Sequence, residues 1–306
     1  MNTYRQVWMT GYSGFLGNDL WNKHLREAVD SRASLLIGRS PSPDRRWPRI
    51  PMDLSLSVPC RFPSADRSGR ILLVHFAARL PDADEPDFAR IEQNEKRFLG
   101  DCAAQGVTDI VYASTGAVYG YREHSVSEYD SLAPEGGYAA YKRSIESFIM
   151  RLWPERCLIL RYFFPYGPGQ RTPRLLPGLI EKITAGHPLS VSGTAAGLLF
   201  NPVYLDDATE AAWWLVRNEA RGIFNVAGRR ALTFKELACA VSKRLCVQPL
   251  LSFTNDEDRK LVASTGKLLS MNGHLLGSSL ERSLDLTVSA YLYIGRQRRP
   301  GGGNEQ

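Results

Sequence analysis

The sequence predicts an α/β fold built on a parallel β-sheet. Through the first half of the chain, short apolar runs alternate with longer segments of helical periodicity. The first apolar run ends in a glycine-rich loop that leads directly into one of these helical segments. Alternation of this kind places the strands side by side and connects them through right-handed crossovers. We therefore expect a doubly wound parallel sheet accompanied by a smaller C-terminal α/β domain.

Eight elements are expected in the first half, in the order strand, helix, strand, strand, helix, strand, helix, strand. Their periodicities place them at Val7–Thr10, Phe15–Ala28, Ala33–Gly38, Ile71–Phe76, Phe88–Gln105, Asp109–Ser114, Tyr138–Leu152 and Cys157–Phe163. The proline- and arginine-rich segment 41–51 is expected to be a loop.

The pattern changes after Pro168, where the elements become shorter and more mixed. Helices are expected at Leu175–Ala185 and Phe234–Leu245, and short strands at Pro202–Asp206 and Gly222–Val226. We therefore expect residues 1–168, with return segments near 199–228, to form the sheet domain. Residues 169–306 are expected to form mainly the second domain.

Composition narrows the classes of function. The chain has 306 residues, of which 43% are hydrophobic and 23% charged, as in ordinary globular proteins. No apolar run is long enough to span a membrane, and the N-terminal residues do not resemble a secretory signal. The net charge of +6 is mild, with both signs interspersed and no nucleic-acid-binding motif. An anionic small molecule is therefore the expected partner, and neither nucleic acid nor a membrane is expected.

The cysteines give no sign of disulfides or of a metal site. They are odd in number and form no CxxC pair, and the five histidines are equally dispersed. We expect reduced, buried thiols, no bound metal and a cytoplasmic protein. The cysteines are Cys60, Cys102, Cys157, Cys239 and Cys246.

The glycine-rich loop predicts a dinucleotide site. Gly11, Gly14 and Gly17 stand between the first strand and the first helix. The first glycine allows a tight turn, the second lets backbone N–H groups approach a pyrophosphate, and the third allows close helix–strand packing. The positive end of the helix dipole also favours the anion. This is the phosphate-binding signature of a Rossmann-type fold.

The end of the second strand favours NADP over NAD. An NAD site places an acidic residue about 20 residues after the glycine loop, where it binds the 2′-hydroxyl of the ribose. This chain has Gly38 and Arg39 there. A guanidinium group suits a 2′-phosphate, so Arg39 favours NADP, whereas an Arg39 that only stacks on adenine leaves NAD open.

A tyrosine and a lysine four residues apart suggest acid–base chemistry. Tyr138 and Lys142 share one face of the predicted helix, and an adjacent ammonium group stabilises a phenolate. Hydroxyl-bearing Ser114 and Thr115 stand at the end of the preceding strand. Together with the phosphate loop, these residues point to an oxidoreductase site.

These motifs resemble those of the extended short-chain dehydrogenases/reductases, and specifically the NAD-dependent epimerase/dehydratase family. The resemblance extends nearly from end to end. Its motifs are the glycine loop at 11–17, Asp53–Leu54, His75–Ala78, Asn94, Ser114–Thr115 with Tyr119–Gly120, Tyr138 with Lys142, Arg161 with Tyr166–Pro168, Tyr204–Asp207 and Ser279–Glu281.

The resemblance implies a role for each site residue. It implies that Thr115 binds the substrate oxygen at the reacting carbon and that Tyr138 transfers the proton. It also implies that Lys142 binds the nicotinamide ribose and lowers the pKa of Tyr138. The residues expected to contact the cofactor, including the glycine loop and Arg39, are Gly11, Gly14, Phe15, Leu16, Gly17, Arg39, Asp53, Leu54, Phe76, Ala77, Ala78, Asn94, Tyr138, Lys142 and Phe163. The cofactor performs hydride transfer, and the protein orients it.

The resemblance also implies a nucleotide-sugar substrate, bound mainly by the second domain, and a homodimer formed through the helices at 88–105 and 138–152.

The chain departs from the family at three places. Gly116 and Ala117 follow Thr115 where dehydratases carry carboxylates, which argues against a 4,6-dehydratase. Phe164 replaces a substrate-binding asparagine, and Phe200 falls in the segment where an arginine holds the substrate diphosphate. Arg171 or Arg174 is an alternative source of that charge.

Three functions remain open from the sequence. The first is a sugar-nucleotide epimerase or a 4-keto-sugar reductase with a Thr/Tyr/Lys catalytic set. The second is an NADPH-dependent reductase of a non-nucleotide carbonyl compound, which the phenylalanines at 164 and 200 favour. The third is a cofactor-binding regulator without catalysis, since a fold alone does not establish activity.

Overall fold

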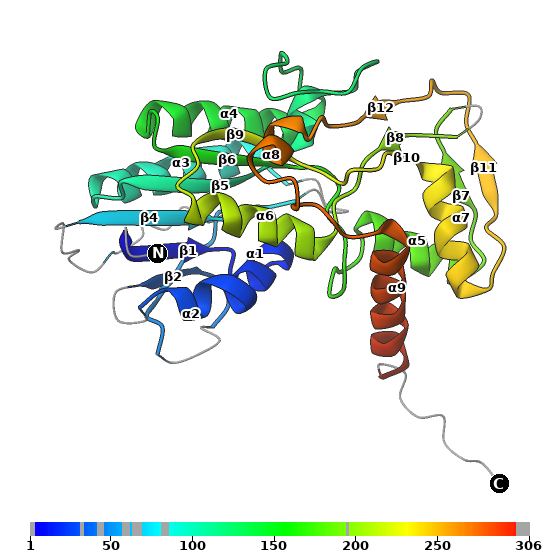
Figure 1. Cartoon of the computed structure of the whole chain (residues 1–306), viewed down its shortest axis with the longest axis horizontal. Helices are drawn as coiled ribbons and strands as arrows, with labels where there is room; N and C mark the ends of the chain where they lie inside the picture. Colours follow the sequence, from blue (N-terminus) through cyan, green and yellow to red (C-terminus); the bar gives the residue numbers. More distant parts are fainter. Residues whose placement is uncertain are drawn as a thin grey trace, which may run out of the picture.

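A computed structural model describes residues 4–30, 34–41, 46–56, 62, 69–80, 86–193 and 196–297, and for residues 294–297 it describes the backbone only. Its main feature is a seven-stranded parallel sheet with the order β3-β2-β1-β4-β5-β6-β9 (Figure 1). The strands are β1 (Tyr4–Thr10), β2 (Leu35–Gly38), β3 (Arg49–Pro51), β4 (Arg70–His75), β5 (Asp109–Thr115), β6 (Cys157–Tyr162) and β9 (Gly222–Val226). This sheet confirms the predicted fold class.

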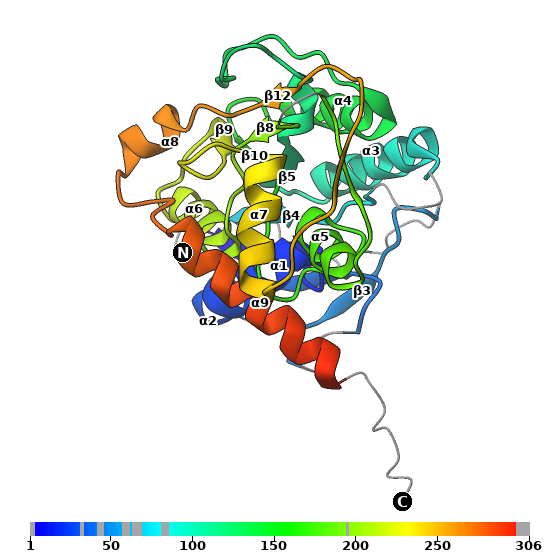
Figure 2. The same cartoon turned by 90° about the vertical axis from the view of Figure 1, so that its right-hand side faces the viewer.

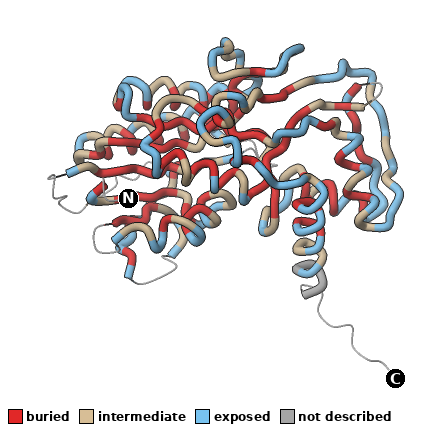
Figure 3. The backbone as a smooth tube through the Cα atoms, viewed as in Figure 1, coloured by how far each residue is buried: buried red, intermediate tan, exposed pale blue. Residues whose placement is uncertain are grey.

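Helices cover both faces of the sheet. One face packs against α1 (Phe15–Leu20), a π-helical turn η1 (Trp21–Leu25), α6 (Leu205–Arg217) and α8 (Gly266–Met271), and α2 (Arg26–Ala28) continues from η1. The other packs against α3 (Phe88–Ala104) and α4 (Gly136–Leu152), as Figure 1 shows. Buried residues therefore run along the central strands, with exposed residues on the outer helices (Figure 3).

The remaining elements gather beyond one end of the sheet, on the right of Figure 1 and in front in Figure 2. Helices α5 (Leu175–Thr184), α7 (Phe234–Leu245) and α9 (Leu280–Gln297) share a separate apolar cluster. Short strands form a three-stranded sheet β10-β8-β12 and a pair β11-β7. Their bounds are β7 Leu189–Val191, β8 Leu199–Phe200, β10 Leu232–Thr233, β11 Leu251–Phe253 and β12 Lys260–Leu261.

Three expectations from the sequence are wrong. Residues 202–206 are not a strand: Tyr204 makes one isolated bridge, and α6 begins at Leu205. Segment 41–51 contains the edge strand β3 within the expected loop. Among the described cysteines, Cys239 and Cys246 are exposed, not buried, because they lie on the solvent side and at the end of α7. Cys60 lies outside the described residues.

Candidate active site

The predicted site residues lie along one edge of the main sheet, because they follow the carboxyl ends of neighbouring parallel strands. Strands β1, β2, β4, β5 and β6 end at Thr10, Gly38, His75, Thr115 and Tyr162. The strand order reverses between β1 and β4, and open α/β sheets bind ligands in the crevice at such a point. The fold thus brings the predicted cofactor and catalytic segments to the same edge.

The glycine loop leaves no room for side chains at two of its positions. Gly11 has a φ of +72°, and a Cβ there would lie 2.4 Å from the carbonyl carbon of Phe76. A Cβ on Gly17 would lie 2.1 Å from the carbonyl oxygen of Gly11. The N–H of Gly14 donates to that same oxygen at 2.9 Å. The loop is therefore a tight backbone cradle of the kind that fits a dinucleotide pyrophosphate.

The first helical turn directs backbone N–H groups toward this cradle. Asn18 donates its N–H to the carbonyl of Gly14 at 2.8 Å, so the amides of Phe15, Leu16 and Gly17 precede the first hydrogen bond of the helix. No side chain caps this end among the described residues. The donors and the helix dipole together suit a phosphate group.

Four predicted cofactor residues meet at the ends of β2 and β3. The side chain of Arg39 is 65% exposed, and its Nη1 lies 3.9 Å from Oδ2 of Asp53. Asn94, on α3, donates from Nδ2 to the carbonyl of Leu54 at 3.0 Å. Leu54 is buried, so this hydrogen bond fixes the loop that follows β3. The structure therefore brings these residues together on the adenine side of the predicted cofactor.

A buried tyrosine in the glycine loop also organises this side, and the sequence reasoning missed it. The ring of Tyr12 lies where Gly38 has no side chain, with its Cε1 3.3 Å from the place of a Cβ. The hydroxyl of Tyr12 donates to the carbonyl of Ser40, and the Ser40 hydroxyl donates to that of Ser13 at 2.9 Å. Gly38 at the strand end was the signal, because a side chain there would press against the ring of Tyr12.

The segment after β4 forms an accessible wall beside the cradle. Phe76 and Ala77 are half-buried and Ala78 is exposed. The N–H of Ala77 donates to Oγ1 of Thr10 at 3.1 Å, and that oxygen lies 2.6 Å from Nδ1 of His75. The ends of β1 and β4 are thus held together while the backbone beyond them remains open to a ligand.

The predicted catalytic residues lie at the contact between β5 and α4. Lys142 is fully buried, and its Nζ donates to the carbonyl of Ala113 at 2.7 Å, two residues before Thr115. Thr115 and Tyr138 are half-buried, and Tyr138 lies one helical turn before Lys142. The hydroxyl oxygen of Thr115 accepts from the N–H of Ala117 at 3.2 Å. Strand end and helix face thereby present a hydroxyl, a phenol and an ammonium group.

Burial dominates the electrostatics of these groups. Burial raises the pKa of Tyr138, the positive charge of Arg174 opposes that rise, and the charge of Glu95 adds to it. Burial lowers the pKa of Lys142 to about 8, against the opposing charges of Glu95 and Glu146. Arg174, just before α5, therefore supplies positive charge to Tyr138, a role that the sequence reasoning gave to Lys142.

Phe163 is buried beside the end of β5. A Cβ on Gly116 would lie 2.5 Å from ring atoms of Phe163, so the ring fills the space beside that glycine. An acidic side chain at 116 would collide with the ring, and Ala117 offers no carboxylate. The acid pair expected of a dehydratase is therefore absent at these two positions, and the packing of Phe163 gives the physical reason at the first.

Two buried glutamates next to this site were missed by the sequence reasoning. Glu95 on α3 and Glu146 on α4 are both inaccessible to solvent. Glu146 forms a bidentate ion pair with Arg161 and accepts from the hydroxyl of Ser114 at 2.5 Å. The signal was helical register, because each glutamate falls on the apolar stripe of its helix.

The two phenylalanines that depart from the family pattern contact each other. The ring centroids of Phe164 and Phe200 lie 4.8 Å apart, and Phe164 has a positive φ of 45°. The neighbouring Asn201 is buried, and its side chain bonds to Gly228 and to both backbone groups of Ala263. Residues 200 and 201 therefore serve packing in this structure, and the charge near Tyr138 comes from Arg174.

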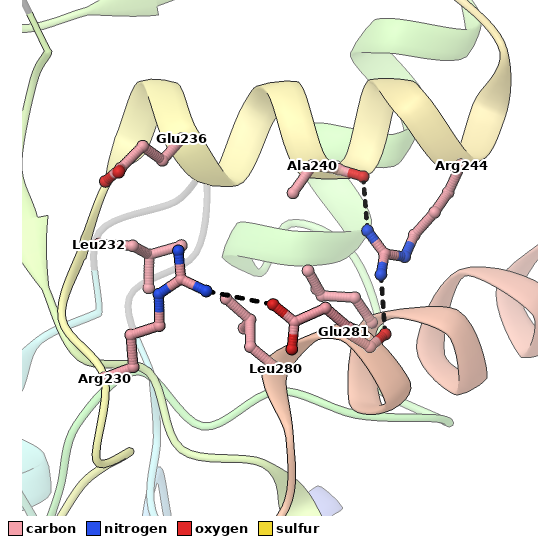
Figure 4. A pocket seen from close by; sticks show the side chains of 8 residues that line it. Arg230, Leu232, Glu236, Ala240, Arg244, Leu280 and Glu281 are labelled. Carbon is pink, nitrogen blue, oxygen red and sulfur yellow. Dashed lines mark hydrogen bonds and ion pairs between the residues drawn. The ribbon is translucent and has the colours of Figure 1, made fainter.

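A small surface pocket lies elsewhere in the fold, between α7 and the start of α9 (Figure 4). Its volume is about 100 Å³, and its lining residues are Arg230, Leu232, Glu236, Ala240, Arg244, Leu280, Glu281 and Leu284. Arg230 pairs with Glu281 at 3.1 Å, and Arg244 donates to the carbonyls of Ala240 and Glu281, both at 2.8 Å. These contacts brace α9 against α7.

The described residues include no group of three or more histidine, cysteine or acidic side chains placed to hold a metal ion. Of the helices in the described ranges, none has the length and apolar character needed to cross a membrane.

Comparison with known proteins places this geometry in a family. The model of the NAD dependent epimerase/dehydratase family matches residues 7–227. An uncharacterized UDP-glucose epimerase of Bacillus subtilis is 24% identical over 279 residues, which cover 82% of this chain and 81% of that protein. An ADP-L-glycero-D-manno-heptose-6-epimerase of Cupriavidus pinatubonensis is 26% identical over 200 residues, 58% of each chain.

Solved structures share the fold. The UDP-glucose 4-epimerase of Thermus thermophilus in complex with NAD superposes with a TM-score of 0.74 at 23% identity, covering 94% of this chain and 99% of that one. The dTDP-glucose 4,6-dehydratase DesIV of Streptomyces venezuelae gives a TM-score of 0.78 at 22% identity, covering 96% and 98%. The family match spans the glycine loop, α4 and all seven strands of the main sheet except the first three residues of β1. The chain therefore belongs to the NAD dependent epimerase/dehydratase family and is an enzyme of that family.

Proposed function

We propose that this enzyme is a sugar-nucleotide epimerase or 4-keto-sugar reductase that uses Thr115, Tyr138 and Lys142. The observation that carries the proposal is the position of Lys142. Its ammonium group is buried at the contact between β5 and α4, one turn after Tyr138, at the sheet edge that also carries the glycine cradle. Acid–base residues and a dinucleotide cradle at one edge are what hydride transfer at a carbinol carbon requires.

Each residue has a distinct task. The bound nicotinamide would accept or donate the hydride, and the residues around it control the proton and the geometry. Tyr138 exchanges the proton of the substrate oxygen, Thr115 orients that oxygen with its hydroxyl, and Lys142 holds the ribose of the cofactor. Burial keeps the pKa of Tyr138 above its ordinary value, the charge of Arg174 partly offsets this, and further positive charge would favour the phenolate.

For the cofactor we propose NADP in preference to NAD. Arg39 is exposed at the end of β2, Arg49 donates to its carbonyl at 3.2 Å, and the hydroxyls of Ser13 and Ser40 lie within hydrogen-bond distance of each other. These are suitable donors for a 2′-phosphate. Arg39→Ala should weaken NADPH binding at least tenfold, about 1.4 kcal/mol, and leave NADH binding as the internal control unchanged. Equal weakening of both, or of neither, would argue for NAD.

For the substrate we propose a nucleotide sugar, because relatives of this chain are named as epimerases of UDP- and ADP-linked sugars. Arg174 is a cation near Tyr138 that suits the diphosphate of such a substrate. The second candidate is a non-nucleotide carbonyl compound. The apolar contact of Phe164 with Phe200 favours it, since the resemblance implies a substrate-binding asparagine and arginine at these places in many nucleotide-sugar enzymes of the family.

Turnover of Tyr138→Phe tests the proposal. The wild-type protein is incubated with UDP-glucose and NAD in one assay, and with keto-sugars or simple ketones and NADPH in a second. NMR identifies the products, and absorbance at the nicotinamide band follows the cofactor. Tyr138→Phe should lose turnover at least a hundredfold while binding cofactor normally. Tyr129→Phe, at an exposed position, is the matched control. An unchanged rate in Tyr138→Phe would exclude this residue as the acid–base group.

The products separate the candidates. Epimerised sugar without net consumption of cofactor identifies an epimerase, and consumption of NADPH with a keto-sugar identifies a reductase of such sugars. Reduction of simple ketones, without binding of UDP-glucose, favours the second candidate. Cofactor binding without turnover of any of these compounds would contradict the proposed function.

We also propose that residues 1–168 with the segments near 199–228 bind the dinucleotide and that residues 169–306 mainly bind the substrate. Support comes from the separate apolar cluster of α5, α7 and α9 beyond the sheet edge.

A homodimer is proposed through α3 and α4, which pack side by side, with Met150 exposed on α4. Light scattering of the purified protein gives the mass, and a monomer at micromolar concentration would contradict the dimer.

A further inference from the structure

The buried carboxylate of Glu95 has no task in the mechanism above, although it lies close to the catalytic helix. It sits in the middle of α3 and faces the sheet. The hydroxyl of Tyr112, on β5, donates to its Oε1 at 3.0 Å, and the hydroxyl of Tyr141, on α4, donates to its Oε2. Nε2 of His75, on β4, lies 3.2 Å from Oε1. Groups from three different elements therefore converge on this one carboxylate.

The same two tyrosines also contact the catalytic lysine, but with their ring faces. Nζ of Lys142 lies 4.0 Å from the ring centroid of Tyr112 and 5.7 Å from that of Tyr141. Cations are attracted to the faces of aromatic rings, and more strongly when the cation is desolvated. A phenol that donates to a carboxylate gains electron density, because hydrogen bonds polarise one another in a low dielectric. Glu95 therefore makes both rings better partners for the ammonium group.

The charge balance around Lys142 also points to Glu95. Two carboxylates act on the buried ammonium group, those of Glu95 and Glu146. Glu146 is already neutralised by its bidentate ion pair with Arg161. Although burial opposes its ionisation, contact with His75 and the charge of Lys142 keep the pKa of Glu95 below its ordinary value. The counter-charge that remains for Lys142 is Glu95.

We propose that Glu95 is a positioning residue of the active site, which holds the ammonium group of Lys142 charged and in place by its own charge and through the rings of Tyr112 and Tyr141. The proposal rests on the proposed function in so far as Lys142 is taken to serve catalysis. Its electrostatic part concerns Lys142 alone, so it can be tested without any turnover.

The charged and titratable groups that face Glu95 set the direction of the effect. They are His75 from β4, Tyr112 from β5, and Tyr138, Tyr141 and Lys142 from α4. Removing the negative charge destabilises the ammonium form of Lys142, so the lysine should titrate at lower pH. The same change should move the alkaline limb of the pH profile of kcat/KM to lower pH, because that limb requires charged Lys142.

The experiment is an NMR titration of the full-length protein carrying lysine labelled with ¹³C at Cε. Lys142→Met assigns the resonance of Lys142. In Glu95→Gln, which keeps the shape and can still bond to the tyrosines, the midpoint of Lys142 should fall by at least about one pH unit. Glu92→Gln is the matched control one turn earlier on α3, since Glu92 is partly exposed and pairs with Lys96. The titration midpoint of Lys142 in Glu92→Gln should equal that in the wild type.

A midpoint in Glu95→Gln that matches the wild type would overturn the proposal. If Glu95→Gln does not fold, Glu95→Asp retains the charge, and its Lys142 midpoint should remain within about 0.3 pH units of the wild type. A fall of a full unit in Glu95→Asp would also overturn it. Loss of turnover in Tyr138→Phe tests the proposed function separately, because the lysine titration requires no substrate.

Discussion

Arg161 and Glu146 form a bidentate ion pair, with N–O distances of 3.1 and 2.7 Å, inside the protein. The arginine side chain is 2% exposed and the glutamate 1%. The pair joins the last predicted strand of the first half, β6, to the helix that carries Tyr138 and Lys142. The third nitrogen of the guanidinium group donates to the hydroxyl of Tyr119 at 2.7 Å. The position of α4 on the sheet therefore depends on a contact that water does not reach.

Arg161→Met should destabilise the protein by about 3–5 kcal/mol, because it leaves the carboxylate of Glu146 buried without its partner. Urea unfolding measures this loss. Arg151→Met, at an exposed position near the end of the same helix, is the control and should cost less than about 0.5 kcal/mol. A loss below about 1 kcal/mol in Arg161→Met would mean that Glu146 takes up a proton or finds water instead.

Gly17→Ala should weaken cofactor binding at least tenfold, about 1.4 kcal/mol, because the new Cβ would lie 2.1 Å from the Gly11 carbonyl and displace the cradle. Calorimetric titration with NADPH and NADH measures the effect. Gly100→Ala supplies the contrast: it lies inside α3 with no described atom within 4 Å of the added Cβ, so it should stabilise the helix slightly. Unaltered affinity in Gly17→Ala would place the dinucleotide elsewhere.

Asn94→Ala should weaken cofactor binding about fivefold, since loss of its hydrogen bond to the Leu54 carbonyl frees the loop beside the adenine site. The neighbouring Gln93→Ala, whose side chain is exposed, should bind as the wild type does. Fluorescence titration measures the cofactor dissociation constant of each variant. Equal constants for the two variants would show that Leu54 is held by its own burial.

We expect Asp109 to contribute to the stability of the protein in acid. Burial opposes its ionisation, but hydrogen bonds from Arg70 and Thr108 and the charge of Arg221 keep its pKa below the ordinary value. Because the native pKa is depressed, this stability is fully present above about pH 4, the value of the unfolded chain, and is lost as pH falls through the native pKa. Asp109→Asn should therefore lower stability at pH 7 and flatten its decline in acid.

Stability curves for the wild type and Asp109→Asn between pH 7 and pH 2 test this. Cofactor affinity should not change, because Asp109 begins β5 and so lies at the opposite end of the strand from the site. If the free energies of unfolding of the two proteins differ by the same amount at every pH, Asp109 contributes packing, and its ionisation does not change on folding.

The sequence-based expectations agree best with the structure where a particular backbone conformation is required. The glycines at 11 and 17 leave no space for a side chain, and the strand ends follow from apolar runs that stop at polar or glycine residues. Prediction failed where an element is set by tertiary contacts. The apolar residues before Asp206 suggested a strand, yet Asp206 and Asp207 lie in the first turn of α6, where the helix dipole favours acidic residues.

Glu95 and Glu146 could not be assigned from the sequence because their partners are distant. Glu95 binds groups on β4, β5 and α4, up to 46 residues away, and Glu146 pairs with a strand that follows its helix. A glutamate on an apolar stripe signals only that some partner exists. The short strands β7, β8, β10, β11 and β12 also escape prediction, since two or three residues carry no periodicity.

The place of β9 at the edge of the main sheet has a consequence for how the chain folds during synthesis. Its residues 222–226 pair in parallel with β6, and the side chain of Asn225 accepts a hydrogen bond from Tyr119. Until this segment has left the ribosome, the wholly buried strand β6 has an open, apolar edge. A chain cut after Pro168 would keep Thr115, Tyr138 and Lys142, yet we expect it to aggregate, because the missing strand comes from the far side of the cut.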